Sequence, residues 1–186
     1  MKNRCFWVSN SQVYRDYHDN EWGVPVFDDQ TLFEFLILET FQAGLSWITV
    51  LNKRENLRKS FDNFDYQKIA EYPESKYAAL LKDTGIIRHK LKIKSAIINA
   101  QHFMEVQNEF GSFSNFIWSY VAGKPIINNF YKREDVPATT VLSDKIAKDL
   151  KIRGFKFVGS TVIYAYMQAI GLVNDHTTDC YKHTLE

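Results

Sequence analysis

The two cysteines of the chain stand near opposite ends of its 186 residues, and each has a histidine nearby in the sequence. Cys5 lies thirteen residues before His18, and His176 lies four residues before Cys180. Two thiolates and two imidazoles form a complete tetrahedral ligand set for zinc, which leaves no position for a catalytic water. We therefore predict one structural Zn²⁺ site that joins the N-terminal and C-terminal segments.

The spacing between His176 and Cys180 predicts that both side chains lie on one face of a helical turn and hold the same ion. Two other arrangements fit the same residues: a disulfide between Cys5 and Cys180, or two unrelated buried thiols with ordinary histidines. Residues 1–5 include basic side chains but no apolar segment of a secretion signal, so we expect a cytoplasmic protein. A reducing cytoplasm favours the metal over the disulfide.

A carboxylate inside an apolar stretch is the second chemical candidate. Residues 31–43 have the composition of a helix, and at about 100° per residue Glu39 falls between the directions of Leu32 and Phe35. A carboxylate in that position is desolvated, which raises its pKa unless donors or a cation compensate. Such groups are candidates for function, although Glu39 could equally bond a buried backbone group.

Aromatic side chains gather around both candidates. Four of them crowd the N-terminal arm beside the proposed zinc ligands: Trp7, Tyr14, Tyr17 and Trp22. Trp47 begins the helix that follows the one with Glu39. Aromatic clusters usually form core, but flat rings with a carboxylate and a tyrosine hydroxyl are also what a pocket for a planar heterocycle requires.

A glycine-bounded turn near the end of the chain is the third candidate. Residues 150–164 predict a helix, a tight turn between Gly154 and Gly159, and a second helix that opens at Ser160 and Thr161. Backbone amides at such a helix start can hold a phosphate, although most turns of this kind are only connections. Two basic stretches, residues 88–94 and 145–156, fit phosphate contact and fit solvated helix faces equally well.

The elements that must position these residues are predicted to be helices. Capping residues and glycine stops delimit the helices, and strand signals are confined to residues 125–140, which we expect to be a loop with at most a short strand. The predicted helices cover residues 31–43, 46–61, a short stretch from 65, 75–84, 89–110, 112 or 114 to about 123, 143–154 and 160–171. This pattern predicts an all-α fold.

Composition bounds the class of protein. A chain of this length with 45% hydrophobic residues suits one continuous domain, residues 1–186, and we expect a monomer. The apolar stretch at residues 32–38 is broken by Glu34 and falls short of the roughly 20 residues that a membrane span needs. The net charge of +1 gives no overall field that would attract a polyanion.

Longer motifs give the chain a specific resemblance. It resembles the 3-methyladenine DNA glycosylase I family, the constitutive, zinc-containing branch of the helix-hairpin-helix DNA glycosylases. Two matching runs are long: YHDNEWGVP at residues 17–25 and QAGLSWITVL at residues 42–51. The other matching stretches are residues 4–5, 7–8, 53–56, 85–89, 153–159 and 171–176. The resemblance spans nearly the whole chain and implies a helix-hairpin-helix glycosylase fold, with the hairpin at about residues 145–171.

The resemblance also implies roles for individual residues. Structural zinc would be held by Cys5, His18, His176 and Cys180. The base pocket would contain Glu39 as the catalytic residue, with Tyr17, Trp47, Trp22 and Trp7 around the base. DNA would be contacted by the loop residues Gln42, Gly44 and Leu45 and by the hairpin residues Gly154, Lys156, Gly159 and Thr161. One departure from the wider superfamily is Asn174, which aligns with a catalytic aspartate elsewhere, with Asp175 next to it.

The activity implied is excision of 3-methyladenine from alkylated double-stranded DNA. Methylation at N3 makes adenine a good leaving group, and a methylated base is easier to flip than a sound one. Since no lysine nucleophile is identified, we expect a monofunctional enzyme that leaves an abasic site without cutting the strand. The alternative is a non-catalytic, zinc-stapled helical module that binds damaged DNA. A metal hydrolase is disfavoured because the four zinc ligands leave no open position.

Overall fold

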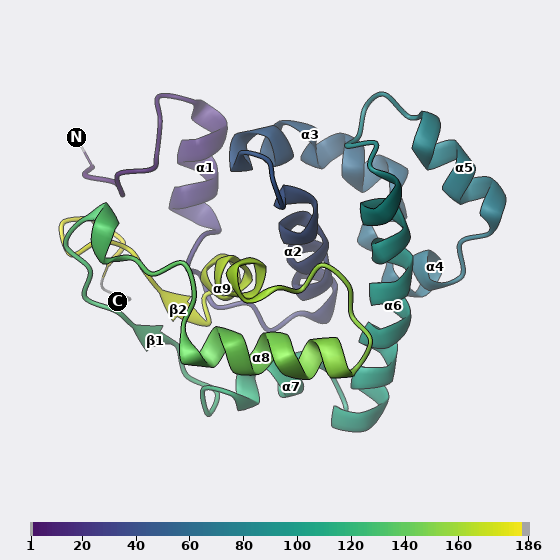
Figure 1. Cartoon of the computed structure of the whole chain (residues 1–186). Coiled ribbons are helices and arrows are strands. Elements are labelled where there is room, and N and C mark those ends of the chain that lie inside the picture. Colours follow the sequence, from purple (N-terminus) through teal and green to yellow (C-terminus); the bar gives the residue numbers. More distant parts are fainter. Residues whose placement is uncertain (1, 184–186) are drawn as a thin grey trace.

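The computed structural model describes residues 2–183, and within that range it contains nine α-helices and two short strands (Figure 1). The helices are α1 (Gln12–Asn20), α2 (Asp29–Gln42), α3 (Trp47–Ser60), α4 (Tyr66–Ala70), α5 (Glu74–Lys82), α6 (Lys90–Phe110), α7 (Phe113–Ser119), α8 (Val141–Ile152) and α9 (Ser160–Ala169). The strands are β1 (Ile126–Ile127) and β2 (Val173–Asn174), and single 3-10 turns cover Asp62–Phe64 and Arg133–Asp135. The predicted all-α fold class is confirmed.

Helix α2 lies at the centre of the array and packs against α3, α6, α7 and α9 (Figure 1). It begins where the Asp28 carboxylate accepts a hydrogen bond of 2.8 Å from the Thr31 amide. Nine of its fourteen residues are buried, on every side of the helix, so it can exist only as a central element. Any polar side chain on its inner turns is therefore held away from water.

The chain leaves α2 through a short loop, residues 43–46, and enters α3. Gly44 has a φ of +78°, a left-handed conformation that an L side chain rarely adopts. The Leu45 amide donates to the Gln42 carbonyl oxygen at 2.6 Å, which closes the turn. The loop therefore projects Leu45 outward, and its side chain is 39% exposed.

Helices α8 and α9 pack against each other, and the predicted glycine-bounded turn connects them. Gly154 has a φ of +99°, and a Cβ there would lie 2.4 Å from the His102 ring, so a side chain would be strained and His102 would have to move. Asn99 of α6 fixes the turn, because its amide group bonds both the carbonyl oxygen and the amide of Lys156, at 3.0 Å and 2.7 Å. The turn is thus fastened to α6 through backbone contacts, which leave the Lys156 side chain exposed.

The two ends of the described chain meet on one side of the molecule. The Tyr181 amide donates to the Asn3 carbonyl oxygen at 3.0 Å, and the Asn3 side chain donates to the carbonyl oxygen of Asp179 at 2.8 Å. Strand β1 pairs with β2 in parallel, which ties the segment after α7 to the segment that follows α9. These contacts bring the N-terminal arm and the C-terminal segment together.

Several predicted elements differ from the structure. Helix α1 was not predicted, because most of its residues are polar. Helix α8 begins at Val141 after Thr140, not after Ser143, because the Thr140 hydroxyl caps the helix and Ser143 completes a reciprocal capping pair. Helix α7 ends at Ser119, earlier than predicted. Within residues 2–183, no helix is long and apolar enough to cross a membrane.

Candidate active site and metal centre

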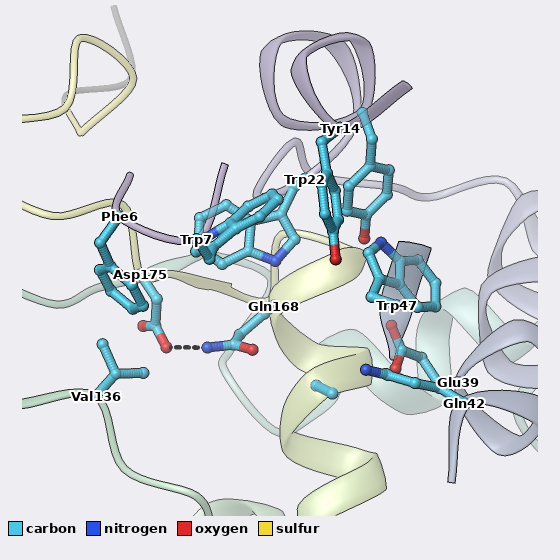
Figure 2. A pocket seen from close by; sticks show the side chains of 12 residues that line it. Phe6, Trp7, Tyr14, Trp22, Glu39, Gln42, Trp47, Val136, Gln168 and Asp175 are labelled. Carbon is cyan, nitrogen blue, oxygen red and sulfur yellow. Dashed lines mark hydrogen bonds between the residues drawn. The ribbon is translucent and has the colours of Figure 1, made fainter. Parts of the chain in front are cut away.

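A cavity of about 270 Å³ opens beside α2, walled by α1, the start of α3, α9 and the N-terminal arm (Figure 2). Seven residues singled out from the sequence line it: Trp7, Tyr14, Tyr17, Trp22, Glu39, Gln42 and Trp47. A further five were not anticipated as its lining: Phe6, Val136, Ala165, Gln168 and Asp175. In Figure 2, Glu39 and Trp47 lie at one end of the cavity, and Asp175, Phe6 and Val136 lie at the other.

Glu39 is buried in the cavity wall, as the helical period predicts, and its residue surface is 4% exposed. Burial raises the pKa of its carboxyl group to about 8, because the charged form loses hydration without a compensating cation. Among residues 2–183, only two buried side-chain polar atoms lack a hydrogen-bond partner: Glu39 Oε2 and Trp47 Nε1. Both belong to cavity residues, so this end of the cavity holds unsatisfied polar groups that a ligand can engage.

Aromatic rings form much of the cavity wall. The rings of Tyr17 and Trp47 lie 5.2 Å apart at 53°, and those of Trp7 and Trp22 lie 5.0 Å apart in an edge-to-face arrangement. The Tyr14 hydroxyl accepts a hydrogen bond of 3.2 Å from the Ile48 amide, which ties α1 to the first turn of α3. Burial and the neighbouring Glu39 carboxyl raise the pKa of Tyr17, so its hydroxyl stays protonated and can donate.

The opposite end of the cavity is built around Asp175. Its carboxylate accepts hydrogen bonds from the Tyr164 hydroxyl at 2.6 Å and from the Gln168 and Asn128 amide groups at 2.7 Å each. These three donors join α9 to the segment after β1. Asn174 does not line the cavity; its side-chain oxygen accepts from the His176 amide. The aligned Asn174 is thus a backbone support, and Asp175 is the residue that faces the cavity.

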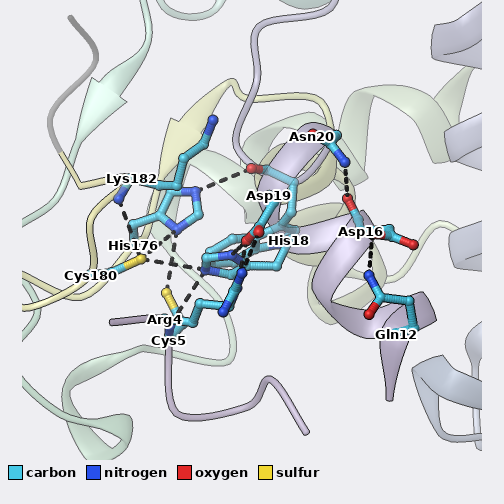
Figure 3. A network of polar contacts seen from close by, with 11 residues as sticks. Arg4, Cys5, Gln12, Asp16, His18, Asp19, Asn20, His176, Cys180 and Lys182 are labelled. Carbon is cyan, nitrogen blue, oxygen red and sulfur yellow. Dashed lines mark hydrogen bonds and ion pairs between the residues drawn. The ribbon is translucent and has the colours of Figure 1, made fainter. Parts of the chain in front are cut away.

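The four predicted metal ligands meet in one buried cluster (Figure 3). Their ligand atoms all lie within 4.8 Å of one another: Cys5 Sγ, His18 Nε2, His176 Nδ1 and Cys180 Sγ. The shortest contacts are 3.3 to 3.5 Å, close to the roughly 3.3–3.8 Å edges of a tetrahedron with zinc–nitrogen and zinc–sulfur bonds of ordinary length. Both cysteines are free thiols. The residues therefore fit a tetrahedral metal ion and do not form a disulfide.

The ionisation of the cluster also suits a metal. A hydrogen bond from the Cys5 thiol, with further bonds from the His176 and His18 rings, lowers the pKa of the Cys180 thiol far below its usual value. The same shared proton raises the pKa of Cys5. Zinc binds cysteines as thiolates, so surroundings that favour loss of a thiol proton suit such a metal.

Each histidine of the cluster is oriented by its second ring nitrogen. His18 Nδ1 lies 2.9 Å from Asp19, whose carboxylate pairs with Arg4, and this ion pair lowers the pKa of Asp19. His176 Nε2 lies 3.2 Å from the carbonyl oxygen of Trp22. Such contacts fix which nitrogen faces a metal. The predicted helical turn at His176 is wrong, since residues 175–177 have no regular secondary structure and a turn follows. Tertiary contacts rather than helical spacing bring His176 and Cys180 together.

The predicted DNA-contacting residues lie mainly outside the cavity. Gln42 reaches into it from the last residue of α2, whereas Gly44 and Leu45 form the exposed turn beyond. The other predicted contacts lie in the turn between α8 and α9 and at the start of α9: Gly154, Lys156, Gly159 and Thr161. Lys156 and Thr161 are exposed, and Gly159 precedes α9 without a capping side chain. They are not part of the cavity lining.

Tyr14 and some of the unexpected lining residues carry a local signal. Tyr14 stands three residues before Tyr17, so both project from one face of α1. Ala165 and Gln168 stand three apart on α9 in the same way. Phe6 and Val136 show no such pattern, because only tertiary folding brings their segments to the cavity.

Comparison with known proteins identifies close relatives over the whole chain. A family model described as methyladenine glycosylase matches residues 7–183. DNA-3-methyladenine glycosylase 1 of Escherichia coli K12 is 49% identical over 177 residues, which cover 95% of each chain. A crystal structure of 3-methyladenine DNA glycosylase I has a TM-score of 0.95 at 51% identity and covers 98% of this chain and all of that one. A variant of such an enzyme, solved in complex with 3-methyladenine, has a TM-score of 0.95 at 34% identity and covers 99% of both chains.

Proposed function

Since the chain belongs to the methyladenine glycosylase family and is a glycosylase, we propose that it excises 3-methyladenine from alkylated double-stranded DNA. The base is flipped out of the duplex into the cavity beside α2, and the bond to its deoxyribose is hydrolysed. The observation that carries the proposal is Glu39 Oε2, a buried carboxyl oxygen without a partner inside an aromatic-walled cavity.

The cavity supports recognition of a planar base by stacking and by its edge. Trp47 stacks on the flipped base, while Glu39 and the Tyr17 hydroxyl bond its polar edge. The cavity volume of about 270 Å³ stands just below the usual range of small-molecule sites, which suits a single base. Trp22 and Trp7 form a further part of the wall. In this arrangement the base is selected by its shape and by the polarity of its edge.

The charge of Glu39 supplies the discrimination between bases. In the free site the pKa of about 8 keeps the carboxyl group largely protonated at neutral pH. An electron-poor, methylated ring that donates a hydrogen bond to Glu39 stabilises the carboxylate and lowers that pKa. Neutral adenine offers less compensation and costs more to unstack. Undamaged adenine is therefore disfavoured both in flipping out of the duplex and in binding to Glu39.

The reaction itself needs modest assistance. The bond between C1′ of deoxyribose and N9 of the base breaks, and its electron pair leaves with 3-methyladenine. Water adds to the resulting sugar cation and loses a proton, which gives an abasic site. No lysine stands among the residues that line the cavity within the described chain, which supports hydrolysis without strand cleavage.

DNA is held by two exposed elements. Gln42, Gly44 and Leu45 enter the duplex beside the flipped nucleotide. The assignment is supported by Gln42, which lines the cavity, and by Leu45, which is exposed in the loop after α2. The turn between α8 and α9 acts as the helix-hairpin-helix element, in which Gly154, Lys156, Gly159 and Thr161 face the phosphates. The support is the glycine-bounded turn before the uncapped start of α9.

The buried cluster holds one structural Zn²⁺, with Cys5, His18, His176 and Cys180 as its ligands. Four protein ligands complete a tetrahedral site, so the ion fastens the two ends of the chain and takes no part in the chemistry. Elemental analysis of the purified protein tests this, with one zinc per chain expected. Unchanged zinc content in both Cys5→Ala and Cys180→Ala would exclude this ligand set.

Incubation with methylated duplex DNA, followed by chromatography of the freed bases, tests the activity. Released 3-methyladenine with intact strands is the expected result. Tight binding of methylated DNA without any released base would instead indicate a non-catalytic module that binds damage, because each cavity feature serves binding as well as cleavage.

A further inference from the structure

Lys92, in the first turn of α6, is a buried cation that binds the end of α2. Only 4% of its surface is exposed. Its Nζ donates to the carbonyl oxygen of Phe41 at 2.8 Å and to that of Ala43 at 2.5 Å. One ammonium group therefore bridges the carbonyl groups of the two residues on either side of Gln42.

Burial of this ammonium group is energetically unfavourable for folding. Among residues 2–183, no carboxylate lies within ion-pair distance of Lys92, and burial lowers its pKa. Removing an unpaired charge from water is unfavourable unless dipoles replace the hydration. The carbonyl groups at the C-terminal end of α2 supply that replacement, since they carry the negative end of the helix dipole.

The contact completes the hydrogen bonding of the α2 terminus. The last carbonyl groups of a helix have no partner inside it. Lys92 donates hydrogen bonds to the carbonyl groups of Phe41 and Ala43, and the Leu45 amide donates to the carbonyl group of Gln42 at 2.6 Å. Three successive carbonyl groups are thereby fixed, directly before the exposed turn at Gly44 and Leu45.

We propose that Lys92 is a positioning residue, which holds the 43–46 loop and Gln42 in the orientation needed to enter damaged duplex DNA. The proposal rests on the function proposed above. Lys92 does not line the cavity and does not contact the base, so it acts through the backbone of the loop. Without its ammonium, the loop carbonyl groups turn toward water and Leu45 loses its fixed direction.

Replacement of Lys92 by methionine tests the proposal, since methionine keeps the stem and removes the donors. Release of 3-methyladenine from methylated duplex should fall about tenfold, the effect of losing hydrogen bonds from a charged group. Release from methylated single strands, and affinity for free 3-methyladenine, should change less than threefold. Lys94→Met is the matched control, because Lys94 lies on the same helix with an exposed side chain.

A double-mutant cycle with Leu45→Gly shows whether Lys92 acts through the loop. If it does, Lys92→Met should cause little further loss on duplex when Leu45 is already removed. Hydrogen exchange provides a readout independent of activity: the amides of residues 43–46 should exchange faster in Lys92→Met than in the Lys94→Met control. Unchanged duplex release, equal losses on duplex and single strands, or additive losses in the cycle would overturn the proposal.

Lys92→Gln covers the case in which the methionine variant does not fold, since its amide still donates to a carbonyl group without the buried charge. The Lys92→Gln variant should also lose more 3-methyladenine release on duplex than on single strands. If neither variant folds, Lys92 serves the fold alone and the proposal is rejected. A parent chain that releases no 3-methyladenine would refute the proposed function instead, and the exchange experiment would still show whether Lys92 holds the loop.

Discussion

The ring nitrogen Nε2 of His176 lies 3.2 Å from the carbonyl oxygen of Trp22, and the two rings meet edge to face at 4.6 Å. The other nitrogen of the same ring faces the thiols of the metal cluster. One histidine therefore contacts both the proposed zinc site and the wall of the cavity. Metal binding and base binding should be coupled through this ring.

Removal of the metal should therefore weaken base binding as well as stability. We expect zinc-free protein, prepared with a chelator under reducing conditions, to melt at a lower temperature and to bind 3-methyladenine several-fold more weakly, because Trp22 and Trp7 lose their support. Calorimetric titration with the free base measures this. His102→Gln, outside the cluster, should keep its zinc and its affinity. Equal affinity of the zinc-free and zinc-loaded chains would show that the cluster does not shape the cavity.

Glu39→Gln should stabilise the fold above neutral pH. The folded-state pKa of about 8 exceeds the unfolded value of 4.5, so only the unfolded chain releases this proton between those pH values. Stability therefore falls by about 1.4 kcal/mol per pH unit across this window. The variant lacks this loss and should gain roughly 4 kcal/mol at pH 8. Denaturant unfolding at pH 5 and pH 8 checks it, and a gain of equal size at both would contradict the assigned pKa.

Affinity for free 3-methyladenine should rise between pH 7 and pH 9. If the ligand binds the carboxylate form of Glu39, the competent fraction increases about tenfold between pH 7 and pH 9, given a pKa of about 8. Fluorescence titration of the cavity tryptophans measures the affinity. The Glu39→Gln variant serves as the control and should show no such rise. A flat profile in the parent chain would mean that Glu39 binds as the neutral acid.

Leu45→Gly should weaken action on duplex more than on single strands. The side chain projects from the loop after α2 and is 39% exposed, so its removal leaves the cavity intact. A gap left by a flipped base exists only in duplex, and filling it with an apolar side chain offsets lost stacking. We expect a loss of about tenfold on duplex and less than threefold on single strands. Comparable losses on both substrates would exclude insertion of Leu45.

Local sequence signals predicted the parts of this fold that are decided locally. Asp28, Asp65 and Ser112 cap helices through amides two or three residues away, which a sequence displays directly. The burial of Glu39 follows from its place in a helix that is apolar on nearly all sides. The resemblance to a glycosylase family, confirmed by the comparisons, extended these signals to the whole chain.

Features decided by tertiary contact were not predictable in this way. Helix α1 depends on packing against α3, since its own sequence is largely polar. Gln168 and Asp175 reach the cavity because α9 and the segment after it fold back on the N-terminal arm. His176 and Cys180 converge without a helix between them, so their spacing predicted a cluster that the structure contains, but for the wrong local reason.

The rate of 3-methyladenine release from methylated duplex, compared between the parent chain and Glu39→Gln, tests the central claim most directly. The claim is that the unpartnered carboxyl group in the aromatic cavity selects the methylated base. We predict a loss of at least about tenfold in release, with a fold at least as stable as that of the parent. Unchanged release by a folded Glu39→Gln variant would contradict the account.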